Sequence, residues 1–335
     1  MTVEPTHLAR VQGSIVGLAV GDALGYPHEF RSVAQVKREL GPEGITGFLS
    51  PQDPRFTRPI MLGTRHPPGT YTDDTQMSLA VAEALLEVPP RDTEALMRAM
   101  GRHFVAWYFG DENDRSPGAT TGQACDRLQA GVHWREAGIA GSKGCGSVMR
   151  VAPIGLVSAD LDWVCETARL SSLLTHGHPT AIEACAAGAL IVALAVRGER
   201  DPERMFAEVE RRVMGRDRGF DACFSRLPEA VRHPPDRALV HPDGDNAALA
   251  LGEGWIAEEA IASAFYCYWR HPRDFRACVL EGVHTDGDSD SIASIAGGIA
   301  GAALGIDAIP ADWRAGIEKS AMLHEVGARL AALAV

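Results

Sequence analysis

The 335-residue sequence lacks several features that would assign it at once to a familiar class of protein. Its seven cysteines lie scattered from Cys125 to Cys278 without a C-x-x-C pair, which is typical of reduced and mostly buried thiols. Residues Met1–Gly13 contain no apolar run of the kind found in signal peptides. The longest apolar stretch, Ile292–Ile306, is too short to span a bilayer. We therefore expect a cytoplasmic protein that does not insert into a membrane.

Positive charge is also scarce. Lys and Arg number 32 against 44 Asp and Glu, which gives a formal net charge of −12. A surface of this sign repels polyphosphate backbones, so a role as a nucleic-acid scaffold is disfavoured. A small phosphate-bearing ligand is still compatible with the sequence, because backbone amides and bound cations can reverse the field at one site.

Alternating β-branched runs of strand length are nearly absent, whereas apolar residues recur at helical spacing along most of the chain. The sequence therefore predicts an all-α fold. The expected helices are Leu8–Leu24, Gln76–Leu86, Thr93–Trp107, Leu161–Leu173, Pro179–Val196, Pro202–Val213, Ala257–Tyr268, Asp274–Val283, Ile292–Leu304 and Trp313–Ala334.

Two long irregular stretches interrupt the helical pattern. Gly41–Tyr71 is rich in Gly and Pro, and Met214–Gly254 mixes Gly, Pro, Asp and Arg. Loops of this length in a compact domain are usually functional or mobile. Because no linker, composition break or repeat is visible, we expect one compact domain over residues 1–335, with long loops at 41–71 and 214–254.

Glycine recurs at every fourth position in two of the expected helices. The two stripes are Gly13, Gly17, Gly21 and Gly25, and later Gly297, Gly301 and Gly305. A glycine inside a helix costs up to about 1 kcal/mol relative to alanine, so a repeated glycine needs a structural purpose. The stripes predict faces without side chains, on which another backbone packs closely.

The first of two acidic clusters is Thr72-Asp73-Asp74-Thr75, directly before an expected helix. Asp and Thr are ordinary capping residues at such a position. A cap needs only one oxygen, however, and this cluster offers two carboxylates and two hydroxyls. Helix capping and metal binding both stay open for this motif.

The second cluster, Asp286-Gly-Asp-Ser-Asp-Ser291, precedes the second glycine-striped helix. Three carboxylates at alternate positions repel one another unless a cation or water separates them. The D-x-D-x-D spacing is not that of a calcium EF-hand, because Ser291 stands where glycine is required and Gly297 where a bidentate glutamate is required. A solvated turn is the other interpretation, although apolar residues flank the loop on both sides.

Both clusters are acidic turns with hydroxyl residues that lead into a helix. If they converge in space, they offer oxygen ligands only, a set that favours Mg²⁺ or Mn²⁺ over Zn²⁺. Two such cations, about 3.5–4 Å apart, would polarise a substrate oxygen and orient a water molecule.

These residues, taken with others, resemble the ADP-ribosylglycohydrolase family, which includes dinitrogenase reductase-activating glycohydrolases and ADP-ribosylarginine and ADP-ribosylserine hydrolases. The resemblance covers nearly the whole chain. Its motifs appear in order as Gly13–Gly25 with Glu29-Phe30, Tyr71–Gln76, Gly144–Arg150 with Ala152-Pro153, Thr175-His176 and Gly287–Ser291.

The resemblance implies an all-α fold with a dinuclear Mg²⁺ or Mn²⁺ centre in a central cleft. The metal ligands it implies are Thr72, Asp73, Asp74, Asp288, Asp290 and Ser291. The catalytic residues it implies are Glu29, Asp73 and Asp290. The substrate-binding residues it implies are Gly141, Ser142, Lys143, Gly144, Cys145, Gly146, Ser147, Met149 and His176.

The chain departs from the family pattern at three positions. Asp286 stands where a glycine is common in the family, so we expect an additional carboxylate to crowd the centre. Lys143 and Cys145 replace an aromatic residue and an asparagine of some members. The adenine-stacking aromatic is then expected elsewhere, at Phe104, Trp107 or Tyr108. Arg150 either aids phosphate binding or braces the glycine-rich loop.

The implied activity is cleavage of the C1″ glycosidic bond of ADP-ribosylated side chains, with arginine favoured as the linkage and Glu29 as general base or proton donor. Taken alone, Glu29 is more typical of a surface loop charge, and Gly141–Ser147 of a flexible turn. Two other functions stay open: hydrolysis of a free derivative such as O-acetyl-ADP-ribose, and a non-enzymatic, crystallin-like metal-binding role. The expected partners are ADP-ribose or ADP-ribosylated protein, bound by a monomer.

Overall fold

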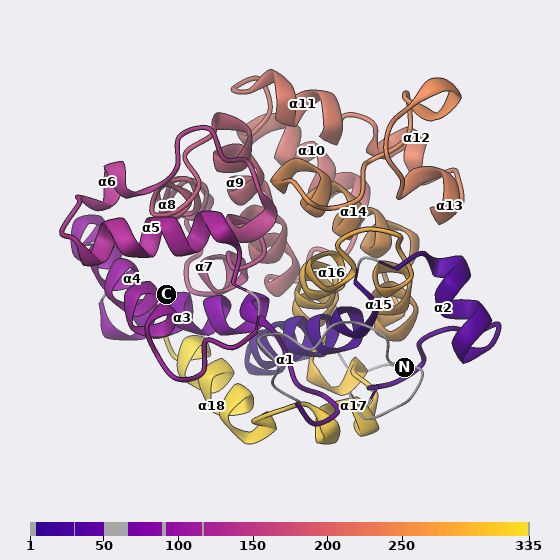
Figure 1. The fold of residues 1–335 in the computed structure, drawn as a ribbon, viewed down its shortest axis with the longest axis horizontal. Coiled ribbons are helices and arrows are strands. Elements are labelled where there is room, and N and C mark those ends of the chain that lie inside the picture. The colour runs from indigo at the N-terminus through magenta and orange to yellow at the C-terminus, as the bar shows by residue number, and fades with distance from the viewer. Residues whose placement is uncertain (1–4, 30, 50–65, 89–91, 116, 334–335) are drawn as a thin grey trace.

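The computed structural model describes residues 5–29, 31–49, 66–88, 92–115 and 117–333. These residues contain helices and connecting segments but no β-strand, apart from isolated bridges between Ile139 and His176 and between Gly144 and Ile256. The all-α prediction is therefore confirmed for this part of the chain (Figure 1).

The helices run through the whole described chain. Those of ten residues or more are α1 (His7–Gly25), α3 (Asp73–Glu87), α4 (Thr93–Tyr108), α5 (Ala119–Gln129), α8 (Leu161–Leu173), α9 (Pro179–Val196), α10 (Pro202–Arg212), α14 (Ala257–Arg270), α16 (Ser289–Leu304) and α18 (Ser320–Ala331). The shorter ones are α2 (Val33–Leu40), α6 (Trp134–Ala137), α7 (Ala152–Leu156), α11 (Arg218–Phe224), α12 (Leu227–Ala230), α13 (Pro235–Ala238), α15 (Phe275–Val283) and α17 (Ala311–Gly316). Short 3₁₀ turns lie at Tyr26–His28, Cys145–Ser147, Gly244–Asn246 and Ile306–Ala308.

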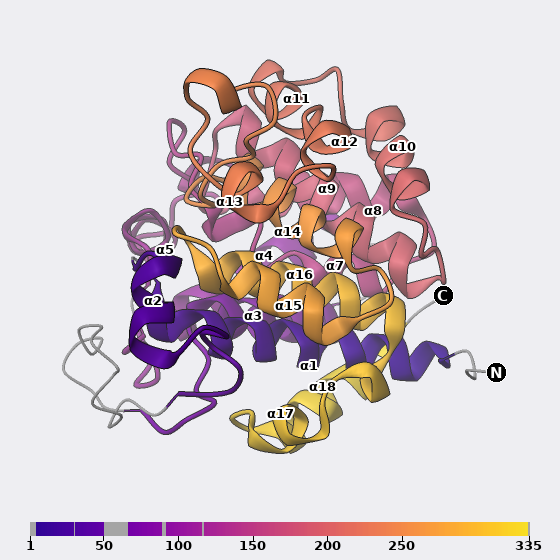
Figure 2. The same ribbon diagram turned by 90° about the vertical axis from the view of Figure 1, so that its right-hand side faces the viewer.

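Helices α1 and α16 pack side by side in the middle of the molecule (Figures 1 and 2). A Cβ on Gly17 would lie 2.4 Å from the carbonyl oxygen of Gly297, and one on Gly301 would lie 1.9 Å from that of Gly13. These distances leave no room for a side chain on either helix. The prediction of a close backbone approach is confirmed, and the two stripes are each other's partners.

Helix α9 is the most apolar element of the core. Its 18 residues are long and apolar enough to cross a membrane, but 83% of them are buried among other helices of the protein. It packs against α7, α8, α14 and α16. It is also longer than the stretch at Ile292–Ile306 that the sequence suggested as the longest apolar run. One continuous cluster of buried apolar side chains reaches from Val11 to Leu330.

The C-terminal prediction of one helix over Trp313–Ala334 is wrong, because α17 and α18 are separate. Lys319 adopts a left-handed φ of 50°, and the backbone N–H of Glu318 donates to the carbonyl of Gly69 at 3.0 Å. This tertiary hydrogen bond takes the chain out of the helix between the two elements. Ala334 lies outside the described residues.

One of the two predicted loops differs from a structureless chain. Met214–Gly254 contains α11, α12 and α13. The rings of Phe220 and Phe224 on α11 are fully buried, and Phe224 stacks on Phe265 of α14. The stretch Gly41–Tyr71 falls partly outside the described residues, as does Phe30. Helices α2 and α5 were not predicted from the sequence.

Two predicted boundaries matter for the site. Both α3 and α16 begin three residues earlier than predicted, at Asp73 and at Ser289. As a result Asp73, Asp74 and Asp290 belong to the first turns of these helices, where the positive end of the helix dipole favours carboxylates.

Candidate metal centre and active-site cavity

A cavity of about 370 Å³ lies where three helices begin. It is bordered by the first turns of α3, α5 and α16, by the segment after Tyr26–His28, and by the glycine-rich segment before α7. Its lining consists of Glu29, Asp73, Asp74, Gly118, Ala119, Thr120, Thr121, Gly144, Cys145, Gly146, Met149, His176, Trp255, Asp288, Asp290 and Ser291. The two acidic clusters, more than two hundred residues apart in sequence, thus face one space.

Carboxylates crowd one end of this cavity. Single carboxylate oxygens of Glu29, Asp288 and Asp290 lie within 4.8 Å of one another, a group that could hold a metal ion. Burial, and then the charge of Asp290, raises the pKa of Asp73 well above its usual range. Burial, and then the charge of Asp22, does the same to the pKa of Asp74. Such crowding favours either bound protons or a bound cation.

The donor atoms of the cavity fit a hard cation. Asp74 is 3% exposed and Asp290 is 5% exposed, and the Oδ1 atom of each accepts no hydrogen bond from any described residue. Buried carboxylate oxygens without partners are costly unless an ion satisfies them. Because oxygen predominates among the donors, the cavity suits Mg²⁺ or Mn²⁺ better than a soft metal.

Capping does not explain the first acidic cluster, because another residue supplies the cap. Asp22, fully buried on α1, accepts hydrogen bonds from the backbone N–H groups of Thr72 and Thr75 at 3.0 Å. It also accepts from their hydroxyls, at 2.8 and 2.6 Å. Burial, followed by the charge of Asp290, raises the pKa of Asp22 to about 7. Asp73 and Asp74 are thereby left available to the cavity.

Capping does account for part of the second cluster. Asp288 Oδ1 accepts from the backbone N–H of Ser291 at 3.2 Å, as the N-cap of α16. The thiol of Cys145 donates to Asp288 Oδ2 at 3.1 Å, and the Ser291 hydroxyl donates to that sulfur at 3.7 Å. Burial, and then the charge of Asp290, raises the pKa of Asp288 well above its usual range. Asp288 therefore combines a structural cap with a place in the acidic group.

Asp286 does not crowd the centre, contrary to the expectation from sequence. It is absent from the lining of the cavity, and its Oδ1 accepts the backbone N–H of Val33 at 2.7 Å. That N–H is one of the amides at the start of α2 that have no partner within the helix. The additional carboxylate therefore attaches α2 to the acidic turn.

The glycine-rich segment contributes only part of what was predicted. Gly144, Cys145, Gly146 and Met149 line the cavity, whereas Gly141, Ser142, Lys143 and Ser147 do not.

Two of the residues outside the lining have other partners. Lys143 forms an ion pair with Glu258, and Ser147 is fully buried, where its hydroxyl accepts from that of Ser172 at 3.1 Å. A third, Ser142, is indirectly involved, because its hydroxyl bonds at 2.9 Å to that of Thr120, which lines the cavity.

His176 presents a neutral ring to the cavity. Burial, and then the charge of Arg150, lowers the pKa of His176 to about 3. Arg150 donates to the hydroxyl of Thr175 at 2.7 Å, and that hydroxyl lies 2.8 Å from Nδ1 of His176. The Thr175 hydroxyl accepts from Arg150, so its own hydrogen can be donated to Nδ1 of His176. We therefore assign the ring proton to Nε2, which lies on the side of Gly144 and Gly146.

Arg150 itself braces this region. It is fully buried, donates to the carbonyl groups of Gly146 and Ser171, and lies over the ring of Phe104 at 4.4 Å. Its guanidinium therefore binds groups inside the fold, and Arg150 does not line the cavity.

The predicted aromatic residues do not reach the cavity. Phe104 is fully buried, Trp107 donates its ring N–H to Gln76 at 3.0 Å, and Tyr108 packs on Gly122. Among the described residues, the ring of Trp255 lines the cavity, and it was not predicted from the sequence. Nor was the first turn of α5, whose N-cap Gly118 leaves the amides without a side-chain cap.

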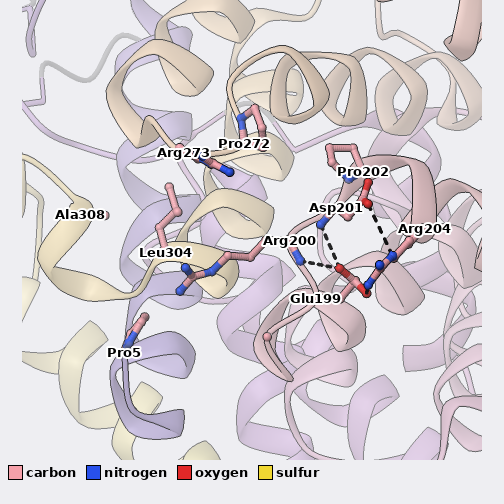
Figure 3. A pocket seen from close by; sticks show the side chains of 11 residues that line it. Pro5, Glu199, Arg200, Asp201, Pro202, Arg204, Pro272, Arg273, Leu304 and Ala308 are labelled. Atoms are coloured by element: carbon pink, nitrogen blue, oxygen red, sulfur yellow. Dashed lines mark hydrogen bonds and ion pairs between the residues drawn. The ribbon is translucent and has the colours of Figure 1, made fainter. Parts of the chain in front are cut away.

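A larger cavity of about 900 Å³ lies near the end of α16 and is lined by three arginines (Figure 3). Arg200 donates to the carbonyl of Ala303 at 3.2 Å, which satisfies the C-terminal end of α16. Arg204 lies close to the carboxylates of Glu199 and Asp201. Because both carboxylates of this cavity lie beside Arg204 and none of the predicted site residues lines it, we place the functional site in the smaller acidic cavity.

Comparison with known proteins shows the family of the chain. A family model described as ADP-ribosylglycohydrolase matches residues 3–335. An uncharacterized protein of Archaeoglobus fulgidus is 34% identical over 322 residues, which cover 96% of this chain and 95% of that protein. ADP-ribosylhydrolase ARH3 of Bos taurus is 28% identical, with 93% of this chain and 89% of that protein covered.

Two more similarities point the same way. The ADP-ribosyl-(dinitrogen reductase) glycohydrolase of Rhodospirillum rubrum is 26% identical, with 92% of this chain and 90% of that protein covered. A solved structure, an ADP-ribosylglycohydrolase-related protein complex, superposes with a TM-score of 0.72 at 26% identity and covers 98% of this chain and 99% of its own. Since the family model spans nearly every residue, the chain belongs to the ADP-ribosylglycohydrolase family, whose named members here are ADP-ribosyl hydrolases.

Proposed function

We propose that this protein is a metal-dependent hydrolase that cleaves the C1″ glycosidic bond of ADP-ribosylated protein side chains and releases ADP-ribose. The observation that carries the proposal is the pair of unpartnered oxygens, on Asp74 and Asp290, in a cavity that also contains Glu29. The named relatives act on ADP-ribosyl groups, which supports the substrate class.

Two divalent cations, Mg²⁺ or Mn²⁺, are proposed between α3 and α16. The proposed ligands are Thr72, Asp73 and Asp74 on one side and Asp288, Asp290 and Ser291 on the other. When bound, such cations polarise substrate oxygens and lower the pKa of a coordinated water. Asp22 orients the α3 side, because it holds the first turn of that helix through Thr72 and Thr75.

The ADP part of the substrate is proposed to lie along the cavity wall opposite the carboxylates. The uncapped first turn of α5 favours the pyrophosphate, because its amides and helix dipole attract anions. His176 adds a neutral N–H donor, and Trp255 offers a ring on which adenine can stack. Gly144 and Gly146 let the substrate approach the imidazole closely.

Glu29 is proposed as the general base. Its carboxylate lies within reach of the same space as Asp288 and Asp290, so it can accept a proton from water that attacks C1″. Positive charge develops on the ribose ring as the glycosidic bond breaks, and the surrounding carboxylates, Asp73 and Asp290 among them, stabilise it.

The charge of the cavity favours arginine as the linked side chain. Among the described residues, five carboxylates line it and no Lys or Arg side chain does. Two divalent cations would leave one negative charge uncompensated. A guanidinium leaving group, which is cationic, suits this field better than a neutral serine hydroxyl.

The test is incubation with Mg²⁺ or Mn²⁺ and with peptides that carry ADP-ribose on Arg, Ser or Glu. The expected result is release of free ADP-ribose, fastest from the arginine peptide and abolished by EDTA and by Asp290→Ala. Glu29→Gln should lose turnover while Mn²⁺ binding, followed by titration calorimetry, stays close to that of the wild type.

Other outcomes would redirect the proposal. Turnover of O-acetyl-ADP-ribose with no activity on any peptide would assign the site to a free ADP-ribose derivative. Metal binding without turnover of any of these substrates would favour a non-enzymatic role. Unchanged turnover in Glu29→Gln would remove Glu29 from the mechanism.

A further inference from the structure

The segment that carries Glu29 is fastened at both ends to the same acidic turn. At its start, the Ser289 hydroxyl donates to the carbonyl of Gly25 at 3.0 Å. At its end, Asp286 Oδ1 accepts the backbone N–H of Val33 at 2.7 Å. Ser289 and Asp286 flank Asp288, so the turn that supplies proposed metal ligands also holds the two ends of residues 25–33.

The two ends are held with different strength. At Gly25 the backbones of α1 and α16 are in contact, since a Cβ there would lie 2.4 Å from the carbonyl oxygen of Ser289. That end is fixed by the core packing of two long helices. At Val33 the attachment to the acidic turn is the hydrogen bond to Asp286, a side chain that is exposed to solvent.

Beyond Val33 the chain stays attached to α15 and to the loop that follows it. The backbone N–H of Ile45 donates to Nε2 of His284 at 2.9 Å, and the Nδ1 of His284 lies 2.7 Å from the carbonyl of Leu280. Arg276 donates to the carbonyl of Thr46 at 3.1 Å. Three side chains from one stretch, at positions 276, 284 and 286, therefore bind the backbone of residues 33–46.

This restraint bears on where Glu29 lies. Its carboxylate oxygen lies within 4.8 Å of oxygens from Asp288 and Asp290, an approach that depends on the path of the backbone that carries it. A loop end that is free to move would carry Glu29 away from this group. The hydrogen bond at Val33 opposes that movement four residues further along the chain.

We propose that Asp286 is a positioning residue, which seats Glu29 at the acidic group by holding the start of α2. The bond uses an amide that α2 cannot satisfy itself, and the negative charge also favours the N-terminal end of that helix. The inference rests on the proposed function only where it concerns turnover; the placement of the segment is tested without substrate.

Two variants of Asp286 separate its roles. Asp286→Asn keeps a carbonyl oxygen as acceptor for the Val33 amide, whereas Asp286→Leu has a similar shape and no acceptor. Asp312→Leu serves as the matched control, because Asp312 is an exposed aspartate in the first turn of α17, away from the cavity.

The first measurement is hydrogen exchange of the Val33 amide, together with tryptic cleavage after Lys37 and Arg38, which are exposed on α2. In Asp286→Leu the exchange should be about tenfold faster, the size expected for one lost hydrogen bond to a charged acceptor. Cleavage should rise in parallel. Asp286→Asn and Asp312→Leu should resemble the wild type in both measurements.

The second measurement is a double-mutant cycle with Glu29→Gln. If Asp286 acts through Glu29, Asp286→Leu lowers kcat about tenfold with KM little changed, and adds no further loss when Glu29 is already Gln. Mn²⁺ affinity of Asp286→Leu should stay within about threefold of the wild type, since Asp286 holds no metal in this scheme.

Each result has a distinct meaning. Additive losses in the cycle, or exchange at Val33 that is unchanged in Asp286→Leu, would overturn the positioning role. A large loss of Mn²⁺ affinity would instead place Asp286 within the metal centre, which also contradicts the inference. A wild type without activity on any ADP-ribosyl substrate would end the proposed function, while the exchange and cleavage results would still decide whether Asp286 holds the segment.

Discussion

Replacing Asp290 by asparagine should stabilise the metal-free protein and remove most of its stabilisation by divalent cations. Asp290 is 5% exposed, and its Oδ1 has no hydrogen-bond partner among the described residues. A carboxylate oxygen of Asp290 lies within 4.8 Å of oxygens from Asp288 and Glu29. Two unit charges at that distance repel by about 3.5 kcal/mol at an effective dielectric constant of about 20.

The two repulsions together would reach about 7 kcal/mol if all three groups stayed ionised. The metal-free protein avoids most of this cost by binding protons, because burial and the charge of Asp290 raise the pKa of Asp288. An asparagine removes the charge and takes no hydrogen bond away from Oδ1. The expected gain in the free energy of unfolding near neutral pH is about 1–3 kcal/mol, equivalent to one or two pKa units.

The cation response should change in the opposite direction. At a cation concentration about 100 times the dissociation constant, the wild type gains about 2.7 kcal/mol of stability. An amide oxygen is a poorer ligand than a carboxylate. If binding to Asp290→Asn weakens about a hundredfold, the gain at the same concentration falls to about 0.4 kcal/mol.

The assay is denaturant unfolding of the wild type, Asp290→Asn and Asp312→Asn, each in EDTA and in excess Mn²⁺. Asp312 is exposed on α17, so its substitution controls for a change of net charge alone. A variant less stable than the wild type in EDTA would refute the argument from repulsion. A gain with Mn²⁺ equal to that of the wild type would refute the assignment of Asp290 as a ligand.

Three further predictions concern packing, substrate binding and pH. Gly21→Ala should cost about 3 kcal/mol in the free energy of unfolding, because its Cβ would lie 2.0 Å from the carbonyl oxygen of Ala293. A Cβ on Gly47 meets no atom within 4 Å, so Gly47→Ala should be nearly neutral in thermal melts that compare the two variants. Trp255→Ala should raise KM about tenfold or more with less effect on kcat, in steady-state kinetics, if adenine stacks on that ring. In EDTA, the free energy of unfolding should fall as pH rises from about 4 to 7. Burial raises the folded-state pKa of Asp22 to about 7, so the folded protein holds a proton that the unfolded chain releases in this range. Excess Mn²⁺ should flatten this dependence on pH.

The fold could be predicted from sequence where the pattern is local. Helical periodicity located nine long or medium helices to within a few residues, and the glycine stripes predicted faces on which another backbone packs closely. The pattern failed at Trp313–Ala334, because the break depends on a hydrogen bond from Glu318 to Gly69, some 250 residues away. No periodicity within the segment contains that information.

The candidate site shows the same limit. The acidic turns and the glycine-rich segment have local motifs, so their residues could be proposed from the sequence alone. Trp255 and the first turn of α5 carry no such motif and enter the cavity only through tertiary packing. Asp22 is the one charged residue between Val11 and Leu24, but its hydrogen bonds from four donor groups of Thr72 and Thr75 could not be deduced from that.

Helix α1 explains why the two acidic turns meet at all. Near its C-terminal end, Asp22 binds the first turn of α3, and one turn later Gly25 lies against the start of α16. Both sets of carboxylates are therefore placed by the same short stretch of one helix. The glycine stripe is what allows this, because any side chain at Gly21 would separate α1 from α16 and move Asp288 and Asp290 away from the α3 side. Packing of the core and assembly of the metal centre thus depend on the same backbone contact.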